Sequence, residues 1–285
     1  MSRSPLYLGI DGGGTACKAR LTDADGRLIG NGLAGPANLT TDGEGAARAI
    51  VAAARAAGLG DGDRVYAVFG LAGANARPAA ERLAAHPFPF ADWLVTTDAD
   101  TALRGAHAGA PGAILILGTG SQGYGRRADG STYRVGGWGF ALSDGASGAV
   151  VGHRAARWAL AAGEGLAPSS PFTAALMARF DDDPAVMLAW AVKAVPRDWA
   201  SLTPLVFDYA AAGDAVAGEL RRQAVGEVEA LIERLAGLGA ERLALTGGLA
   251  TSYRPHIGHG KGRLAEPVGD ALDGALAMAR QRWPG

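Results

Sequence analysis

A glycine-rich turn between two short strands, in residues 6–21 (LYLGIDGGGTACKARL), constrains the fold more than any other feature. Apolar residues lead into Asp11, three consecutive glycines follow, and apolar and basic residues alternate after Thr15. This alternation has the two-residue period of a β-strand. Three glycines exceed what a hairpin needs, and backbone N–H groups without neighbouring side chains can surround a phosphate. The stretch therefore predicts a phosphate-binding hairpin, with a plain tight turn as the alternative.

The residues after the glycines exclude two better-known motifs. A P-loop requires Gly-Lys-Ser/Thr opening a helix, and a dinucleotide fingerprint requires a helix after its glycines. A strand pattern follows Thr15 instead. Residues 118–123 match the dinucleotide pattern G-x-G-x-x-G. No helix is predicted after its last glycine, because the chain turns back at Gly130, so we discount the match.

The opening pattern occurs twice. A turn at residues 23–26 and an extended segment at 27–32 complete a three-strand meander, and the same order of parts begins again at residue 113. The other predicted strands are 64–71, 93–97 and 241–246, and the predicted helices are 44–57, 79–85, a short one within 99–109, 147–162, 171–180, 184–193, 219–238 and 270–282. We expect an α/β protein with two lobes, residues 1–107 and 108–285, and a last helix (about 270–282) that packs back on the first lobe.

Composition limits the classes of partner. With 285 residues and 48% hydrophobic content, the chain can form one large or two moderate domains. A net charge of -1 gives no basis for binding nucleic acid or a membrane surface. The single cysteine, Cys17, excludes an internal disulfide or a cysteine-ligated cluster within one chain. No apolar signal core or membrane-length run is present, so we expect a cytoplasmic protein that acts on a small molecule.

The repeated meanders with glycine turns, followed by a strand that ends in Gly247-Gly248, resemble the sugar kinase, heat-shock chaperone and actin superfamily over the whole chain. Within it, the sequence is similar to the bacterial glucosamine and N-acetylglucosamine kinases grouped with the BadF/BadG-type ATPases. The resemblance implies a two-lobed, actin-like (ribonuclease H-like) fold with duplicated domains. It also implies ATP and Mg²⁺ as cofactors and an amino sugar as substrate, and it allows a homodimer.

The resemblance carries over to individual positions, which form a nucleotide group and a sugar group. The nucleotide group comprises Asp11, Gly12, Gly13, Gly14, Thr15 and Lys18 in the first phosphate motif, Gly118, Thr119, Gly120 and Ser121 in the second, and Gly247 and Gly248 in the adenosine motif. The sugar group comprises Asn38, Gly73, Asp98, Thr119, Gln122, Gly137, Trp138 and Asp144. Asp98 is also the implied catalytic residue, and Asp11 the implied metal ligand.

Phosphoryl transfer requires positioning, charge neutralisation and a base. By the resemblance, Asp98 would take the proton of the sugar 6-hydroxyl. Asp11 would hold Mg²⁺ through water, and Lys18 would act as a point charge on phosphate. The alternatives are a helix-capping Asp98, a turn-forming Asp11 and a solvated Lys18.

The sugar residues also have structural alternatives. Asn38 and Asp144 are suited to reading sugar hydroxyls, although a loop turn and a helix cap would explain them too. Trp138, between two glycines, can offer its ring to a pyranose, and core packing is the alternative. Two departures leave the choice of sugar open. Gly145-Ala146 stands where many relatives have an acidic or amide residue and then glycine, and Gln122 stands where N-acetylglucosamine kinases usually have asparagine.

The predicted reaction transfers the γ-phosphoryl group of ATP to the 6-hydroxyl of glucosamine, with N-acetylglucosamine as the alternative substrate. A BadF-type activator would need a cysteine-bound cluster between subunits, and one strand cysteine argues against it. A sensor that binds ATP and sugar without transfer is a further alternative.

Overall fold

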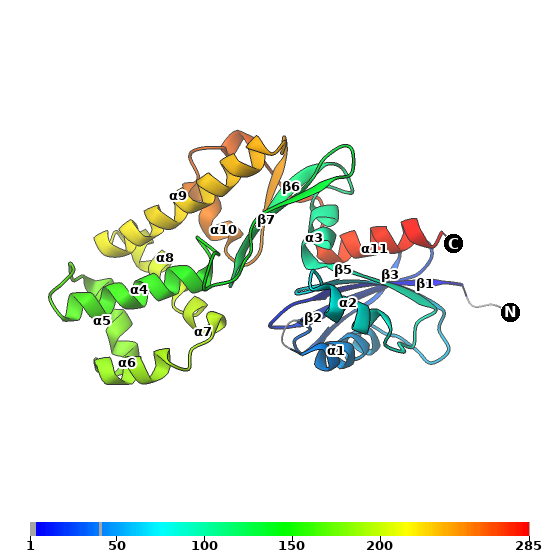
Figure 1. Cartoon of the computed structure of the whole chain (residues 1–285), viewed down its shortest axis with the longest axis horizontal. Coiled ribbons are helices and arrows are strands. Elements are labelled where there is room, and N and C mark those ends of the chain that lie inside the picture. Colours follow the sequence, from blue (N-terminus) through cyan, green and yellow to red (C-terminus); the bar gives the residue numbers. More distant parts are fainter. Residues whose placement is uncertain (1–3, 40–41, 285) are drawn as a thin grey trace. The chain divides into compact units, whose positions relative to one another are not determined.

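The computed structural model of the chain describes residues 4–39 and 42–284. These residues form two compact units (Figure 1). Unit 1 comprises residues 1–114 together with 266–285, and unit 2 comprises residues 115–265. One unit therefore contains both ends of the chain, whereas the other is continuous.

Unit 1 contains a five-stranded mixed sheet in the order β3-β2-β1-β4-β5. The strands β1, β2 and β3 form an antiparallel meander, and β4 and β5 extend it in parallel with β1. The elements are β1 (Leu6–Gly12), β2 (Cys17–Thr22), β3 (Leu28–Ala34), α1 (Gly43–Ala56), β4 (Val65–Leu71), α2 (Arg77–Ala84), β5 (Asp92–Thr97), α3 (Asp98–Ala106) and α11 (Ala271–Arg282). The β1–β2 hairpin predicted around the first glycines is confirmed.

Helices cover both faces of this sheet because β1 is apolar on both sides. Leu8 and Ile10 belong to the core that includes α1. Tyr7, on the other face, packs in a second core with Ala275 and Leu276 of α11. Gly9 allows the helix to come close, since a Cβ atom there would lie 2.8 Å from the Leu272 carbonyl oxygen.

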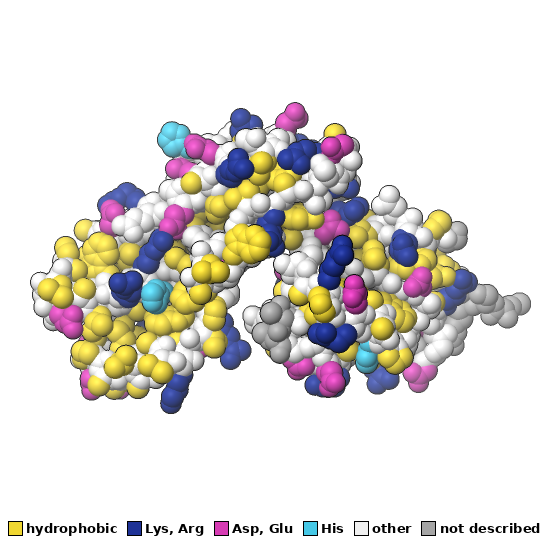
Figure 2. Space-filling view, viewed as in Figure 1, with side chains coloured by type: hydrophobic (Ala, Val, Ile, Leu, Met, Phe, Trp, Pro, Cys, Tyr) yellow, Lys and Arg dark blue, Asp and Glu magenta, His cyan; other side chains and the backbone are white. Residues whose placement is uncertain are grey.

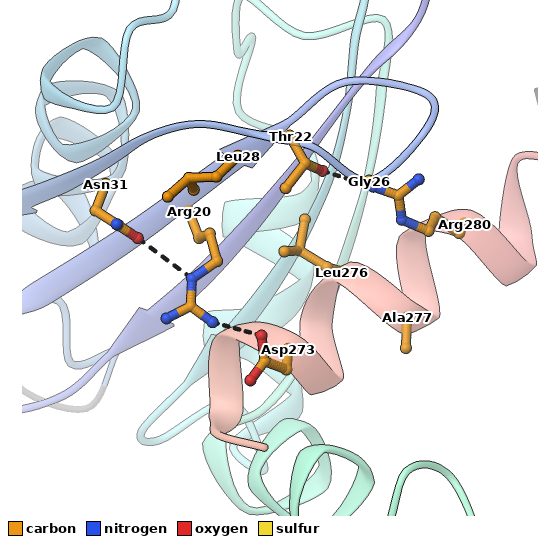
Figure 3. A pocket seen from close by; sticks show the side chains of 9 residues that line it. All are labelled: Arg20, Thr22, Gly26, Leu28, Asn31, Asp273, Leu276, Ala277 and Arg280. Atoms are coloured by element: carbon orange, nitrogen blue, oxygen red, sulfur yellow. Dashed lines mark hydrogen bonds and ion pairs between the residues drawn. The ribbon is translucent and has the colours of Figure 1, made fainter. Parts of the chain in front are cut away.

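The first turn of α11 is tied to β2. Asp270 caps the helix by accepting the Asp273 N–H, in a capping box. Arg20 donates to Asp270 at 3.0 and 2.9 Å and to Asp273 at 2.5 Å. Figure 3 shows Arg20 between Asn31 and Asp273, within a groove of about 480 Å³ formed by β2, β3 and α11.

Unit 2 contains most of a second five-stranded sheet, in the order β10-β9-β6-β7-β8, and an all-helical segment. The strands are β6 (Gly112–Leu117), β7 (Ser121–Arg126), β8 (Thr132–Gly136), β9 (Leu243–Thr246) and β10 (Leu264–Ala265). The helices are α4 (Gly148–Gly163), α5 (Pro171–Met177), α6 (Pro184–Ala191), α7 (Pro196–Ala200), α8 (Thr203–Ala211), α9 (Ala215–Gly237) and α10 (Ala250–Tyr253), with single 3₁₀ turns at Ala178–Phe180, Arg254–His256 and Lys261–Arg263.

Two long helices form the framework of unit 2. The helix α4 packs against α5, α7 and α8, and α9 packs against α8 and β7. A Cβ atom at Gly152 would lie 1.9 Å from the Trp199 carbonyl oxygen, so α4 and α7 are in backbone contact. Exposed apolar side chains gather on and beside α6, where Leu188 and Val192 are 65% and 77% exposed (Figure 2).

The two-lobed α/β fold class is confirmed. The predictions include neither α7 nor α8, which are short helices that begin at or next to proline. They also start α9 four residues late, because Asp214 caps the helix by accepting the Val216 and Ala217 N–H groups. Among residues 4–39 and 42–284, no helix combines the length and apolar character that a transmembrane segment needs.

Candidate active site

The carboxyl ends of three adjacent parallel strands in unit 1 bring several predicted residues to one sheet edge. Gly12 of β1 pairs with Leu71 of β4, and Leu71 pairs with Thr97 of β5. The segments that follow these strands therefore start side by side. They are the first glycine turn, the Ala72-Gly73 turn and the beginning of α3. Open α/β sheets bind ligands at this edge.

The first glycine turn has an open backbone. The Gly13 N–H donates to the Ala16 carbonyl at 3.0 Å, which closes the hairpin. Among the described residues, a Cβ atom at Gly13 would meet nothing within 4 Å, and one at Gly14 would meet only the Asn38 side chain at 4.0 Å. A ligand can thus approach the main chain here, and Asn38 lies beside it.

Gly12 is required for packing, in contrast to Gly13. A Cβ atom at Gly12 would lie 2.4 Å from the Leu71 side chain. Its carbonyl accepts the Ala72 N–H at 2.8 Å, and the Ala72 carbonyl accepts the Leu39 N–H at 3.0 Å. These bonds join the first turn, the Gly73 turn and the Asn38 loop into one backbone network.

Two carboxylates and one lysine supply the charge at this edge. Asp11 is directly opposite Lys18 across the hairpin, and Lys18 is exposed. Burial raises the pKa of Asp11, Lys18 lowers it, and the negative charges of Asp98 and Asp270 raise it further. The site therefore concentrates more negative than positive charge around Asp11.

Asp98 occupies the first helical position of α3. The N-cap is its neighbour Thr97, whose side chain accepts the Asp100 N–H at 3.1 Å. One Asp98 oxygen accepts the Ala99 N–H at 2.9 Å, which fixes the orientation of the carboxyl group. Burial raises the pKa of Asp98, whereas the Ala99 N–H lowers it. The Asp98 carboxylate therefore binds a proton more tightly than the carboxylate of an exposed aspartate does.

The second glycine turn, in unit 2, is held by α4. The Gly148 and Ala149 N–H groups at the start of the helix donate to the carbonyls of Gly118 at 2.8 Å and Thr119 at 3.2 Å. Within the turn, the Gly118 N–H donates to the Gly120 carbonyl at 2.9 Å. Ser121, the first residue of β7, is buried and donates its hydroxyl to the Gly145 carbonyl at 2.6 Å.

The predicted sugar residues of unit 2 surround this second turn. A Cβ atom at Gly120 would lie 2.8 Å from the Asp144 carboxylate, and one at Gly137 would lie 2.6 Å from the Gln122 side chain. Asp144 is buried and accepts the Gly139 N–H at 3.3 Å. Burial raises the pKa of Asp144, and the hydrogen bond lowers it.

Trp138 projects from the loop between β8 and α4. It is 67% exposed, so it does not pack in the core. The Arg134 guanidinium lies 3.9 Å from its ring centroid and covers one face of the ring by a cation–π contact. The exposure leaves a large aromatic surface available to a ligand.

The Gly247-Gly248 pair is placed against β6. Gly247 has φ +90°, and a Cβ atom there would lie 2.4 Å from the Leu117 carbonyl oxygen. That carbonyl also accepts the Leu249 N–H at 2.9 Å. The hydroxyl of Thr246 is buried and has no hydrogen-bond partner within the described part of the chain. Only glycine fits the first position of the pair.

The structure thus groups the predicted residues unit by unit. Unit 1 brings together Asp11, Gly12, Gly13, Gly14, Thr15, Lys18, Asn38, Gly73 and Asp98, and unit 2 brings together Gly118, Thr119, Gly120, Ser121, Gln122, Gly137, Trp138, Asp144, Gly247 and Gly248. The groove in Figure 3 contains none of them, and neither does a cavity of about 440 Å³ between α4 and α9. No group of three or more His, Cys, Asp or Glu residues suited to a metal occurs in residues 4–39 and 42–284.

Sequence reasoning missed three residues around the segment after Asp144. Glu227 and Tyr253 contact that segment, and Arg154 pairs with Glu227. Two of them bind positions 81 and 107 residues away in the sequence, and no local pattern indicates such contacts.

The geometry defines a two-lobed α/β protein with a glycine-lined turn and a nearby carboxylate in each unit. The profile of the BadF/BadG/BcrA/BcrD ATPase family matches residues 8–257, and the chain belongs to this family.

Three known proteins illustrate the similarity. The glucosamine kinase GspK of Vibrio cholerae is 37% identical over 280 residues, which cover 96% of this chain and 95% of that protein. A solved structure from Chromobacterium violaceum, assigned provisionally as an N-acetylglucosamine kinase, is 35% identical, with a TM-score of 0.89 and coverage of 96% and 98% of the two chains. A glucokinase of the ROK family from Streptomyces griseus is 21% identical and has a TM-score of 0.56 over 97% and 99% of the chains, so it shows the fold alone.

Proposed function

We propose that the chain is an ATP-dependent hexosamine kinase that phosphorylates the 6-hydroxyl of glucosamine and releases ADP. Membership of the ATPase family and the 37% identity to a glucosamine kinase support this function. The observation that carries it is the placement of Asp98, a fixed carboxylate with a raised pKa, at the same sheet edge as the open first glycine turn. N-acetylglucosamine is the second candidate substrate, supported by the similarity to the Chromobacterium violaceum protein.

In the proposed reaction, Asp98 acts as the general base. Its carboxylate accepts the proton of the sugar 6-hydroxyl as that oxygen attacks the γ-phosphorus of ATP and the bond to ADP breaks. Burial raises the proton affinity of the group, and the Ala99 N–H holds it in one orientation. Both effects favour directed proton transfer.

The glycine turns would bind the phosphates of ATP through main-chain N–H groups. Lys18 would add a positive charge at the first turn, and Gly247-Gly248 would let the nucleoside lie against the backbone. Burial raises the pKa of Asp11, Lys18 lowers it, and the negative charges of Asp98 and Asp270 add to the rise; a divalent cation would offset that negative charge. Asp11 would hold Mg²⁺ through water, and the ion would supply charge neutralisation at the phosphates.

Each unit has its own candidates for contacts with a sugar. In unit 1 they are Asp98, Asn38 and the Gly73 turn. In unit 2 they are Asp144, Gln122, Thr119, Gly137 and Trp138, whose ring is exposed. A carboxylate such as Asp144 accepts hydrogen bonds from sugar hydroxyls and favours a substrate that carries an ammonium group. A cytoplasmic location and a homodimer remain predictions from the sequence.

An activator with a cysteine-bound cluster is disfavoured by the position of Cys17. The side chain is completely buried in the core of unit 1. Burial, with a smaller contribution from Asp11, raises the pKa of its thiol to about 12. A thiol that keeps its proton is a poor ligand for a cluster.

A coupled ADP-release assay across glucosamine, N-acetylglucosamine, N-acetylmannosamine and glucose tests the function. We expect ATP turnover to depend on added sugar and kcat/KM to be highest for glucosamine. ADP release that does not respond to any of the four sugars would contradict the proposal and favour a sensor that does not transfer phosphate.

A further inference from the structure

The three residues before Ser147, Asp144, Gly145 and Ala146, adopt a backbone that needs external support. Asp144 and Ala146 have φ values of 62° and 60°, in the left-handed region. Aspartate tolerates this region, but alanine does so at a cost of about 1–2 kcal/mol. Such conformations persist only when surrounding contacts hold them.

Three side chains from distant elements supply that support. Ser121 of β7 donates to the Gly145 carbonyl at 2.6 Å, and Tyr253 of α10 donates to the Ala146 carbonyl at 2.7 Å. The Ala146 N–H donates to Glu227 of α9 at 2.6 Å. We call Ser121, Tyr253 and Glu227 the clasp. All three bonds end on backbone groups of Gly145 and Ala146.

Glu227 is the charged member of the clasp, and both of its oxygens are engaged. Oε2 accepts from Ala146, and Oε1 accepts from the Arg154 guanidinium at 2.5 Å. The two side chains are about one-third exposed, at 31% for Glu227 and 37% for Arg154. A hydrogen bond to an ionised carboxylate is stronger than one between neutral groups. Glu227 therefore contributes most of the directional hold on Ala146.

The clasp holds Gly145 and Ala146, the two residues that follow Asp144. That carboxylate is placed beside Gly120 of the second turn and accepts the Gly139 N–H. If Ala146 relaxed to an ordinary conformation, the direction of the chain at Asp144 would change with it. We propose that Glu227 is a positioning residue that fixes the orientation of Asp144 for binding the sugar. This inference rests on the proposed function of Asp144.

A volume-matched substitution tests the role. The Ala146 N–H and the Arg154 guanidinium bind different oxygens of Glu227, and glutamine replaces one of these oxygens by an NH₂ donor, so the Glu227→Gln variant loses one of the two bonds in this geometry. We expect the KM for glucosamine to rise about 10-fold while the KM for ATP stays within two-fold. Glu219→Gln is the matched control, because Glu219 lies about two turns before Glu227 on the same helix and pairs with Arg222 and Gln223 at the surface. An unchanged glucosamine KM in the Glu227→Gln variant would overturn the inference.

A rescue experiment separates positioning from a general loss of stability or charge. Glycine adopts φ near +60° without the cost that alanine bears. Adding Ala146→Gly to Glu227→Gln should therefore recover at least half of the lost glucosamine affinity on a logarithmic scale. No recovery in a folded double variant would show that Glu227 acts by another route. If Glu227→Gln does not fold, Tyr253→Phe, which removes only the bond to the Ala146 carbonyl, should give the same one-sided rise in KM.

Hydrogen exchange distinguishes failure of this inference from failure of the proposed function. The Ala146 amide should exchange at least 10-fold faster in Glu227→Gln than in the parent chain, whether or not sugar is phosphorylated. Unchanged exchange would refute the clasp itself. Absence of sugar-dependent turnover in the parent chain, with faster exchange in the variant, would refute only the function assigned to Asp144.

Discussion

The two glycine turns follow the same strand order but are stabilised differently. The first turn, in unit 1, is an open hairpin tip that has Asp11 and Lys18 at its base, and apart from the neighbours of Gly13 in the chain, no atom of the described residues lies within 4 Å of a Cβ built there. The second turn, in unit 2, has no charged residue within Gly118–Ser121 and is bonded to the first residues of α4. The two meanders thus share a backbone pattern but differ in their side chains.

This difference indicates a division of roles between the units. In unit 1, half-buried carboxylates with raised pKa values stand at the strand ends, which suits proton transfer and charge neutralisation. In unit 2, hydrogen bonds fix the backbone around one carboxylate, Asp144, which suits recognition of shape. The following predictions test this division, from the largest expected effect to the smallest.

Replacing the proposed base in unit 1 should have the largest effect. We expect Asp98→Asn to lower kcat about 10³-fold with the KM for ATP nearly unchanged, since general bases contribute about 10²–10⁴-fold. Asparagine can still accept the Ala99 N–H. Steady-state kinetics measure the loss, and turnover within 10-fold of the parent would exclude Asp98 as the base.

The stability of the same variant provides its control. Folding raises the pKa of Asp98, so the folded chain binds this proton more tightly than the unfolded chain. As the pH rises from the unfolded pKa through the higher folded pKa, ionisation therefore costs stability, and this cost is fully present above the folded pKa. Asp98→Asn should melt at the same temperature as the parent or higher. A lower melting temperature would mean that the loss of activity partly reflects unfolding.

A pair of glycine substitutions should separate the two turns. Gly13→Ala adds a methyl group in open space, so the fold should persist while the KM for ATP rises about 10-fold, equivalent to about 1.4 kcal/mol. Gly120→Ala places its methyl group 2.8 Å from the Asp144 carboxylate and should raise the KM for glucosamine instead. Gly226→Ala, on an open face of α9, is the control that should change neither. The same pattern of KM values in both turn variants would contradict the division of roles.

Removing the tie between β2 and α11 should have the smallest effect. Arg20→Met removes the bonds to Asn31, Asp270 and Asp273 and should lower the free energy of unfolding by about 1 kcal/mol. Both KM values should stay within two-fold. Urea unfolding measures the change, with Arg48→Met as the control for a weak surface pair at 3.9–4.0 Å. A strong effect on the KM for ATP would show that α11 supports the first turn directly.

Local signals allowed much of the fold to be predicted from the sequence. Consecutive glycines and a two-residue alternation lie within 16 residues, and they correctly predicted the hairpin of β1 and β2. The exposure of Trp138 follows in the same way from the glycines on either side. The roles of these residues in binding and catalysis remain predictions.

The clasp could not be predicted because its signal is not local. Glu227 lies within a 23-residue helix, and glutamate is a common residue in helices. Glu227 accepts a hydrogen bond from the Ala146 N–H, 81 residues away in the sequence. The two groups meet only in the packed structure. The left-handed Ala146 is equally unexpected, since alanine normally avoids that region.

The composition of unit 1 from both ends of the chain has a consequence for synthesis on the ribosome. When residue 265 has been added, unit 2 has its complete sequence, but α11 does not yet exist and the sheet face with Tyr7 and Val68 is uncovered. That apolar face is exposed for as long as α11 is missing, and transiently exposed apolar surface promotes aggregation. We therefore expect a chain without α11 to aggregate more readily than one that carries it.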